Sequence, residues 1–421
     1  MTRLAKLFFS YLLFVQLILY LTGLSVPSLP NYEQKSSVPT TTEIRGVWLT
    51  NVASGVLFVP WGIDRAIEQL SALNFNTLYP VVWNRGHTFY KSATAKSVIG
   101  DDTQPLLNLM HGGQDVLAKL IKLAKPKSIS VIPWFEYGFM APPNSAIAKR
   151  HPEWLTNGQG GVISISEMLP EESDNDPTNK LVWLNPLHPE VQQFILALIT
   201  EVITNYDVEG IQFDDHFGMP VQFGYDPYTI KLYQEEHQGK SPPKNTFDSE
   251  WMSWRASKIT RFMTEIHQVV KDLKPNAKIS LAPNSQYFAY KYYLQDWSTW
   301  VKKRLIDELV LQVYRNNISS FVTELEQPAV KFARTKIPVA IGISTGTWQT
   351  PVKIDQIKKQ VQAVRDRSFF GISFFYWESL WGYITPESPP YRRQVFQKMF
   401  SAKAARPLAP VNSEQLTSSD N

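Results

Sequence analysis

The chain of 421 residues contains no cysteine. Disulfide bonds and thiolate metal sites are therefore excluded. No two histidines have the H-x-H or H-E-x-x-H spacing of common metal sites, so neither a metal nor another cofactor is expected. For an exported protein, the lack of disulfides fits a bacterial envelope better than a eukaryotic secretory route.

Charge is also scarce. Only 19% of the residues are charged, the formal net charge is +4, and no block of lysine and arginine stands out. The sequence therefore offers no electrostatic basis for nucleic-acid binding. Hydrophobic residues make up 43% and aromatic residues 13%, with 13 Trp and 18 Tyr. Such a chain folds into a globular body, and exposed aromatic rings would suit the CH-rich faces of sugars.

The first residues have the order of an export signal. Arg3 and Lys6 precede an apolar run from Leu7 to Leu24. The run is also about as long as a minimal membrane span, so residues 1–26 are predicted to be a signal peptide or an N-terminal membrane anchor. Basic flanks stay in the cytoplasm, which would place the body in the bacterial periplasm or cell envelope.

Between two polar ends, strand and helix patterns alternate. Residues 27–42 are predicted to be a linker and residues 403–421 a disordered tail. The predicted strands are Ile44–Thr50, Thr77–Trp83, Ser130–Phe135, Gly210–Asp214, Lys278–Ala282, Glu308–Tyr314, Pro338–Ile343 and Gly371–Trp377. The predicted helices are Ile63–Leu73, Gln114–Ala124, Pro189–Tyr206, Glu250–Leu273, Tyr292–Arg304, Ser319–Phe332, Val352–Arg367 and Arg392–Ser401.

Strict alternation of strands and helices predicts a parallel sheet. Eight such units close most naturally into a single (β/α)8 TIM barrel, here over residues 43–402. An open doubly wound sheet is the alternative, but it would want a glycine-rich first βα turn, and Asn51–Gly55 is a poor one. Three βα loops are long, as functional loops tend to be, and they are Asn84–Gly113, Tyr137–His188 and His216–Ser249.

The fourth predicted strand ends in two consecutive acids and a histidine, Asp214, Asp215 and His216. Acids at the C-terminal end of a barrel strand are placed for catalysis, whereas a helix N-cap would explain only one of them. Glu136 and Glu378 follow the third and eighth strands. Because glycoside hydrolysis needs a carboxyl pair, this set predicts a glycosidase.

Each acid has a predicted role. Asp214 is expected to be the ionised nucleophile or base, and Glu378 the proton donor among apolar neighbours. Asp215 is either the second acid or an orienting partner. Glu136 either binds a substrate hydroxyl or replaces Glu378 as the acid. Alternatively, Glu136 and Glu378 form structural ion pairs at the mouth, with Arg85 or Arg315 as partners.

Further side chains at the same strand ends are predicted to bind substrate. His216 either orients a substrate hydroxyl or caps the following loop, and a metal site around it and the two aspartates is a weaker alternative. Asn284 and Tyr314 follow the fifth and sixth strands. The candidate sugar platforms, some of which would instead pack the barrel rim, are Trp83, Trp134, Trp348, Trp377 and Trp381.

Three segments resemble a known family: Glu43–Thr50, Asn76–Tyr79 and Asp207–Asp215 are similar to motifs of the glycosyl hydrolase-like 10 family. The resemblance spans roughly residues 43–402. It implies a (β/α)8 barrel, export, and glycosidase activity on cell-wall glycan, in particular peptidoglycan strands without stem peptides. The motif's acids match Asp214 and Asp215, and the acid of the eighth strand matches Glu378.

Two positions depart from that pattern. Gln212 stands where many relatives carry histidine, and the lipobox cysteine of lipoprotein members is absent. The sequence therefore predicts an exported glycoside hydrolase acting on a bacterial envelope polysaccharide, with peptidoglycan glycan as the first candidate. The alternatives are a non-catalytic carbohydrate-binding or scaffold barrel, and a glycosidase acting on α-glucan.

Overall fold

A computed structural model describes residues 41–168, 180–347, 349–382 and 385–407. The predicted signal or anchor segment, residues 1–26, lies outside the described residues, as does nearly all of the predicted linker. None of the helices within these ranges combines the length and apolar character needed to cross a membrane.

The strands close into a parallel barrel of eight strands, which confirms the predicted fold. Around the barrel the order is β2, β3, β6, β10, β11, β12, β13 and β14, and the pairing of β2 with β3 closes the ring. Their bounds are Ile44–Leu49, Thr77–Asn84, Trp134–Phe135, Gly210–Asp214, Lys278–Ala282, Glu308–Gln312, Val339–Ser344 and Gly371–Phe375. The third predicted strand is interrupted, because its first part forms a separate short strand, β5 (Ser130–Val131), that also pairs with β3.

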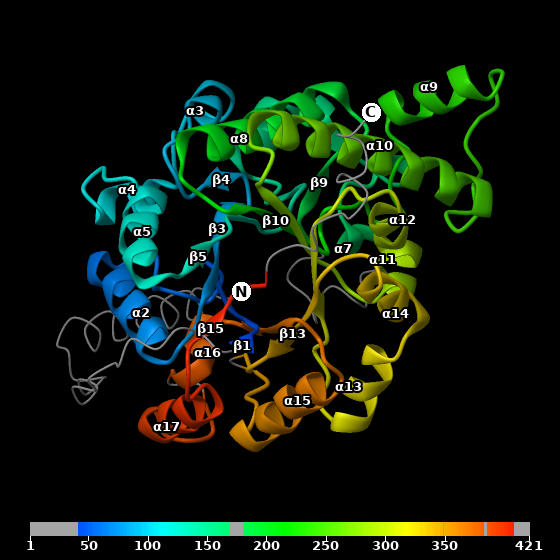
Figure 1. Ribbon diagram of the computed structural model, residues 1–421. Coiled ribbons are helices and arrows are strands. Elements are labelled where there is room, and N and C mark those ends of the chain that lie inside the picture. The colour runs from blue at the N-terminus through cyan, green and yellow to red at the C-terminus, as the bar shows by residue number, and fades with distance from the viewer. Residues whose placement is uncertain (1–40, 169–179, 348, 383–384, 408–421) are drawn as a thin grey trace, which may run out of the picture. The chain divides into compact units, whose positions relative to one another are not determined.

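Helices surround the barrel in chain order (Figure 1). They are α2 (Pro60–Ala72), α5 (Val116–Ala124), α8 (Pro189–Asn205), α10 (Ser249–Leu273), α11 (Gln286–Tyr293), α12 (Trp297–Lys302), α13 (Ile318–Leu325), α14 (Pro328–Arg334), α15 (Ile354–Asp366), α16 (Trp377–Trp381) and α17 (Pro389–Met399). Several begin at side-chain caps: Asp115 accepts a hydrogen bond from the Ala118 amide, and Asp248 accepts one from the Trp251 amide.

Two predicted helices are each divided in the structure. The segment predicted as Tyr292–Arg304 is split at Leu294, whose φ of 55° ends α11 in the left-handed region. The segment predicted as Ser319–Phe332 is split before Pro328, because proline lacks the N–H group that would continue the helix and is favoured at the start of a new one.

The three long βα loops contain secondary structure of their own. The loop after β3 forms β4 (His87–Thr88), α3 (Ala93–Val98) and α4 (Pro105–Met110). The loop after β6 forms a small antiparallel sheet of β7 (Met140–Ala141), β8 (Leu155–Thr156) and β9 (Val182–Leu184), with α6 (Ala146–Arg150) and α7 (Ile165–Met168). The loop after β10 forms α9 (Pro227–Glu236).

A line of hydrogen bonds runs through the barrel interior. The indole of Trp48 donates to Gln212 Oε1 at 2.6 Å, and Gln212 Nε2 donates to Ser280 Oγ at 2.9 Å. Ser280 Oγ in turn donates to Glu308 Oε1 at 2.9 Å. Gln212 is fully buried and has both a donor and an acceptor in use, so its amide can link these neighbours without a histidine.

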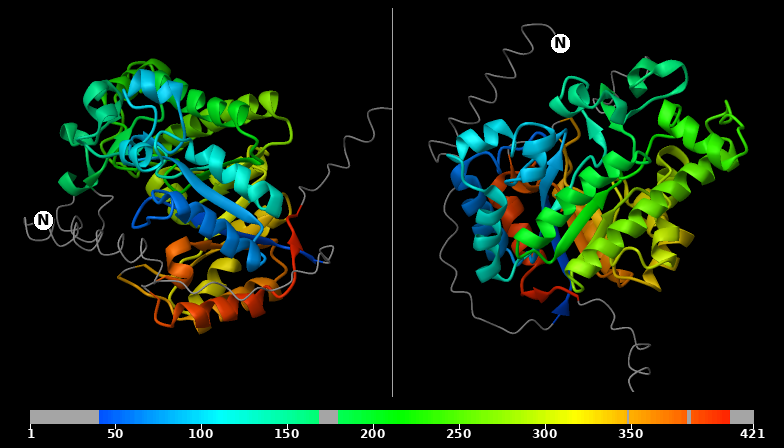
Figure 2. Two further views of the ribbon diagram at one scale, coloured as in Figure 1. Left: turned by 90° about the vertical axis from the view of Figure 1, so that its left-hand side faces the viewer. Right: turned by 90° about the horizontal axis from the view of Figure 1, so that it is seen from above.

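The line ends at the N-terminal side of the barrel in a buried ion pair. Glu308 is 1% exposed and pairs with the guanidinium of Arg406. Arg406 follows β15 (Ala404–Ala405), which pairs in parallel with β1 (Thr41–Thr42), as the adjacent red and blue arrows of Figure 2 show. This strand pairing joins the last two residues of the predicted linker to Ala404 and Ala405 of the predicted tail.

The buried ion pair of Glu308 and Arg406 generates a stability prediction. Replacing Arg406 with methionine leaves the carboxylate of Glu308 buried without its cation, so R406M is expected to lower the free energy of unfolding by roughly 3–5 kcal/mol. Urea unfolding followed by tryptophan fluorescence measures the change. K331M removes the exposed ion pair with Glu326 and is expected to cost under about 1 kcal/mol. Equal losses of unfolding free energy in the two variants would contradict a special role of the buried Glu308–Arg406 pair.

Candidate active site

Asp214 lies at the C-terminal end of β10 and is surrounded by donors. Its Oδ2 accepts hydrogen bonds from the Trp134 indole and the Tyr137 amide, both at 3.2 Å. Its Oδ1 accepts the His216 amide at 2.9 Å. The side chain is only 2% exposed. Donors on both oxygens fix the orientation of the carboxyl group.

Asp215 is held by amides from the next two strands. Asn284 Nδ2 donates to Oδ2 at 2.7 Å, and Gln312 Nε2 donates to Oδ1 at 3.0 Å. His216 lies between the two aspartates, with Nδ1 3.5 Å from Asp214 Oδ1 and 3.4 Å from Asp215 Oδ1. The predicted grouping of Asp214, Asp215, His216 and Asn284 is therefore present as a single cluster. Gln312 belongs to it as well, although its position at a strand end was its only signal in the sequence.

Charges in this cluster compensate one another. Burial raises the pKa of Asp215, and the charge of Asp214 raises it further. Burial alone would lower the pKa of His216, but the carboxylates of Asp215 and Asp214 outweigh it and raise that pKa to about 9. A protonated His216 at neutral pH therefore offsets part of the negative charge that the aspartates bring together.

Glu136 joins the cluster from the end of β6. Both of its oxygens accept from the Thr50 hydroxyl, at 2.9 and 2.8 Å, and the side chain is 2% exposed. Burial raises the pKa of Glu136 to about 8, and the negative charge of Asp214 also raises it. Glu136 is thus a protonated carboxylic acid at neutral pH beside an aspartate, which is the combination that acid catalysis requires.

Glu378 lies on the short helix α16, on the β14 side of the mouth. Its Oε1 accepts hydrogen bonds from the Ser54 hydroxyl and, at 3.3 Å, from the Val56 amide. Its buried Oε2 has no hydrogen-bond partner. Burial raises the pKa of Glu378 to about 7. Glu378 is therefore a second protonatable acid, but its neighbours come from the β2–α2 loop rather than from the aspartates.

The alternative of structural ion pairs does not hold for these two glutamates. Within the described part of the chain, neither Glu136 nor Glu378 has a salt bridge. Arg315 pairs instead with Glu324 at 2.7 Å. The guanidinium of Arg85 lies over the ring of Tyr137, 5.5 Å from its centroid.

Most of the predicted sugar platforms are not available to a sugar. Trp83 is completely buried and its indole donates to the Gly138 carbonyl, while Trp381 is 5% exposed and donates to Gln69. Trp377 is also 5% exposed and packs edge-on against Trp381. Trp134 contacts Asp214 as a hydrogen-bond donor rather than as a platform. Trp348 lies outside the described residues.

These corrections share a physical reason. Large indoles at a barrel rim fill the space between strands and covering loops, which buries more apolar area than an exposed position would. Tyr314 is different: it is half-buried and stacks on Phe375, with ring centroids 5.6 Å apart. Burial raises the pKa of Tyr314, and the charges of Asp215, Asp214 and Glu136 raise it further.

Exposed aromatic rings occur instead on α11, directly after β11. Tyr287 is 70% exposed and Phe288 40% exposed. Phe288 lies 5.0 Å from Tyr292 and 5.9 Å from Tyr293 between ring centroids, and Tyr293 lies 6.3 Å from His216. We call Tyr287, Phe288 and Tyr292 the α11 ridge. Its signal in the sequence was the run QYFAYKYY beside Asn284, which the strand-end search passed over.

The cluster also contains the only group of possible metal ligands among the described residues. One ligand atom each from Asp214, Asp215 and His216 lies within 4.8 Å of the others. A metal would need His216 in its neutral form, but the aspartates raise the pKa of that histidine to about 9. The donors already bound to both aspartates also compete for the same oxygens, so the arrangement fits acid–base chemistry better than metal binding.

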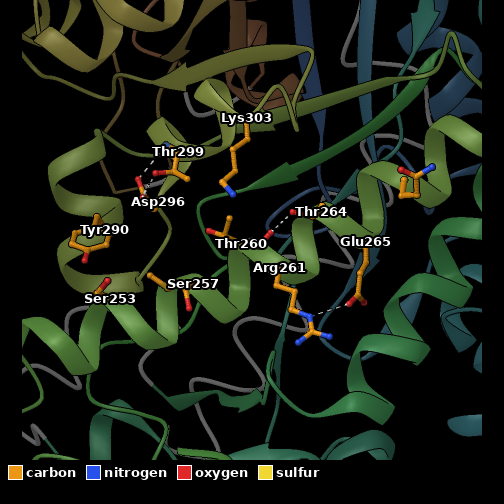
Figure 3. Close-up of a pocket in the computed structure, with 12 residues that line it drawn as sticks. Ser253, Ser257, Thr260, Arg261, Thr264, Glu265, Tyr290, Asp296, Thr299 and Lys303 are labelled. Carbon is orange, nitrogen blue, oxygen red and sulfur yellow. Dashed lines mark hydrogen bonds and ion pairs between the residues drawn. The ribbon is translucent and has the colours of Figure 1, made fainter. Parts of the chain in front are cut away.

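Two hollows are present near these elements. The larger, of about 640 Å³, lies on the outside of the barrel between α10 and the α11–α12 segment (Figure 3). Among its charged groups, Arg261 pairs with Glu265, and Asp296 caps α12 by accepting from the Thr299 amide. The smaller, of about 390 Å³, lies at the mouth beside the ends of β2 and β3. Of these two hollows, only the smaller lies at the mouth, and Asn51, which lines it, follows Thr50, the hydrogen-bond donor to Glu136.

Comparison with known proteins agrees with this geometry. The Glycosyl hydrolase-like 10 family matches residues 43–364. The glycosyl hydrolase DigH of Escherichia coli K12 is 25% identical over 333 residues, which cover 68% of this chain and 67% of DigH. The glycosyl hydrolase YngK of Bacillus subtilis is 22% identical over 287 residues, and the matched region spans about half of YngK (49%).

Solved structures show the same fold at low identity. The glycoside hydrolase domain of PgaB (BpsB) from Bordetella bronchiseptica has a TM-score of 0.61 and 13% identity, and the match covers 87% of this chain and all of that domain. The catalytic domain of a β-amylase from Paenibacillus polymyxa has a TM-score of 0.57 and 10% identity over 86% of this chain and 99% of that domain. The resemblance detected in the sequence is thus confirmed: the chain belongs to the glycosyl hydrolase-like 10 family and is a glycosidase.

Proposed function

We propose that this glycosidase is exported and hydrolyses a bacterial envelope polysaccharide, with peptidoglycan glycan strands as its substrate. The observation that carries the chemistry is the cluster of Asp214, Asp215, His216 and Glu136 at one barrel mouth. An α-glucan would be an alternative substrate, and a barrel that only binds carbohydrate would be an alternative function.

In the proposed reaction Asp214 is the ionised carboxylate. Three N–H donors contact its two oxygens and His216 lies 3.5 Å away, so the carboxyl group is held in one orientation, as a nucleophile or base requires. The proposed role of His216 and Asp215 is to orient Asp214. Because Asn284 and Gln312 occupy both oxygens of Asp215, that side chain is fixed and acts through its neighbours.

The proposed proton donor is Glu136. It is protonated at neutral pH, and its chain neighbour Tyr137 donates its amide to Asp214, which supports a position beside that acid. Glu378, the donor favoured by the sequence, is the second candidate, because its buried Oε2 has no partner and its pKa is also raised. The two glutamates differ in pKa and in the hydroxyl that each contacts, so they can be distinguished in solution.

The α11 ridge supports a polymeric substrate. Its exposed rings continue outward from His216 through Tyr293, and Phe247, itself 43% exposed, extends the path edge-on to Tyr292 at 6.4 Å. Stacking of sugars on such rings would bind units beyond the one at the acids. A long glycan fits this arrangement better than a disaccharide does.

The first prediction concerns the acids themselves. D214N and E136Q should each lower kcat on purified glycan strands by about 10²- to 10⁴-fold, because each removes a group that acts on the reacting bond. Release of reducing ends measures the rate. D355N changes an exposed acid on α15 and should leave kcat unchanged. Undiminished rates in both site variants, with wild-type circular dichroism, would exclude this pair of roles.

A pH profile separates the two candidate donors. Activity is lost as the donor deprotonates, so the basic limb of kcat/KM should lie near pH 8 for Glu136 and near pH 7 for Glu378. The Thr50 hydroxyl lowers the pKa of Glu136, and the Ser54 hydroxyl lowers that of Glu378. T50V should therefore move the limb to higher pH if Glu136 is the donor. A limb that moves in S54A and stays fixed in T50V would assign the role to Glu378.

The α11 ridge predicts that the effect of its variants on KM depends on the length of the glycan substrate. Y287A and F288A should raise KM for long glycans by roughly tenfold each, since each removes one stacking surface. KM for the shortest cleavable oligosaccharide should change less than twofold. L109A removes a side chain that is equally exposed, at 76%, and should affect neither substrate. Equal effects on short and long substrates would show that the ridge does not bind distal sugars.

A further inference from the structure

The hollow beside the acid cluster has a distinct chemical character. Its volume is about 390 Å³, and its polar lining includes Asn51, Asn84, Arg85, His87, Gln104 and Asn144. No acid lines it. Burial lowers the pKa of His87, so Arg85 supplies the permanent positive charge of this hollow.

A tight hairpin holds Arg85 in place. Asn84 pairs with His87 across β3 and β4, so Arg85 and Gly86 are the two turn residues. Their φ angles are 51° and 78°, as a two-residue turn of this kind requires. A Cβ on Gly86 would lie 3.1 Å from Ile147 Cγ2, which shows how closely the tip packs against α6. The cation is therefore presented from a rigid support.

Two groups in this hollow have no hydrogen-bond partner. Asn84 is 1% exposed; its Nδ2 donates to Asn51 Oδ1 at 2.7 Å, but its own Oδ1 accepts nothing. The Nε of Arg85 is buried and also unpartnered. Within the described residues Arg85 has no ion pair. Buried polar groups are normally paired. An unpaired acceptor, Asn84 Oδ1, beside an unpaired cationic donor, Arg85 Nε, is therefore the pattern of a ligand site.

The hollow is connected to the acids through one ring. The guanidinium of Arg85 lies 5.5 Å from the ring centroid of Tyr137, and that ring lies 4.7 Å from the ring of His216. The Tyr137 amide donates to Asp214. A sugar substituent in the hollow would therefore belong to the sugar at the acids or to its direct neighbour.

We propose that this hollow is a subsite for a carboxylate-bearing sugar, an inference that rests on the proposed glycosidase function. Arg85 binds the carboxylate. Asn84 accepts a hydrogen bond from a hydroxyl or amide N–H. The fork of a guanidinium matches a carboxylate, and the amide oxygen supplies the acceptor that a neutral donor needs. The lactyl ether carboxylate of N-acetylmuramic acid in strands without stem peptides has this chemistry, and so does a uronate.

The test compares glycans that carry a carboxylate with glycans that lack it. The substrates are peptidoglycan strands with free lactyl carboxylates, the same strands with the carboxylates reduced to alcohols, and hyaluronan as a uronate-containing polymer. R85N removes the cation and suits the left-handed backbone there, R85K keeps the charge, and R261Q removes an exposed arginine on α10 as the matched control.

On strands with free carboxylates, R85N should raise KM about 10- to 100-fold while kcat changes less than threefold. R85K should bring KM part of the way back to the wild-type value. R261Q should match wild type. On reduced strands, wild type should already show the raised KM, and R85N should add nothing. Cleavage of hyaluronan with the same Arg85 dependence would identify a uronate as the source instead. An equal effect of R85N on free and reduced strands would overturn the carboxylate subsite.

Direct binding keeps the two proposals distinguishable. In the D214N variant, N-acetylmuramic acid should bind more tightly than N-acetylglucosamine by calorimetry, and adding R85N should abolish the difference. If wild type cleaves none of the glycans but this difference is found, the proposed substrate is wrong and the subsite stands. If the glycans are cleaved and the two sugars bind equally, the subsite is wrong and the glycosidase proposal stands.

Discussion

The register of β10 against its two neighbours determines the chemistry of this barrel mouth. Gln212 and Phe213 pair with Trp134 and Phe135 of β6, and Asp214 pairs with Ala282 of β11. Glu136 therefore emerges beside Asp214, and Asn284 emerges beside Asp215. Since side chains alternate along a strand, a slip of one residue would turn Asp214 away from the barrel interior and separate it from its donors.

Bringing these acids together costs electrostatic free energy, and the cluster offsets that cost in two ways. Donor groups from separate strands and loops occupy the oxygens of Asp214 and Asp215. His216 takes up a proton between them, because their charges raise its pKa to about 9. Glu136, whose oxygens accept from the Thr50 hydroxyl, keeps its own proton instead, because burial raises its pKa to about 8. Different protonation states among adjacent acids are what acid–base catalysis needs.

The two sides of the mouth differ in what they could bind. On the side of β11, the α11 ridge presents aromatic faces, and the ammonium of Lys291 lies 5.1 Å from the ring centroid of Tyr287 and 5.3 Å from that of Tyr292. On the side of β3, the hairpin carries one cation and an open amide oxygen. A polysaccharide lying over the acids between them would be held by stacking at one end and recognised by its charge at the other. Length and charge are thus separate features of the same proposed substrate.

The sequence by itself determined the barrel, the family and the acidic strand end. Eight alternating units leave little choice of fold, and Asp214, Asp215 and His216 are adjacent in the chain, so their grouping needs no tertiary information. It could not determine which tryptophans are exposed, because Trp83 and Trp381 have the same pattern at a strand end whether they face a sugar or the core.

Only the tertiary structure decided that Glu136 rather than Glu378 adjoins the aspartates, that Arg406 pairs with Glu308 across almost a hundred residues, and that Asn84 is buried against Asn51 with its own Oδ1 unpaired. Each of these depends on contacts between segments far apart in the sequence, and on burial, which sets the pKa of a carboxyl and the need of a polar atom for a partner.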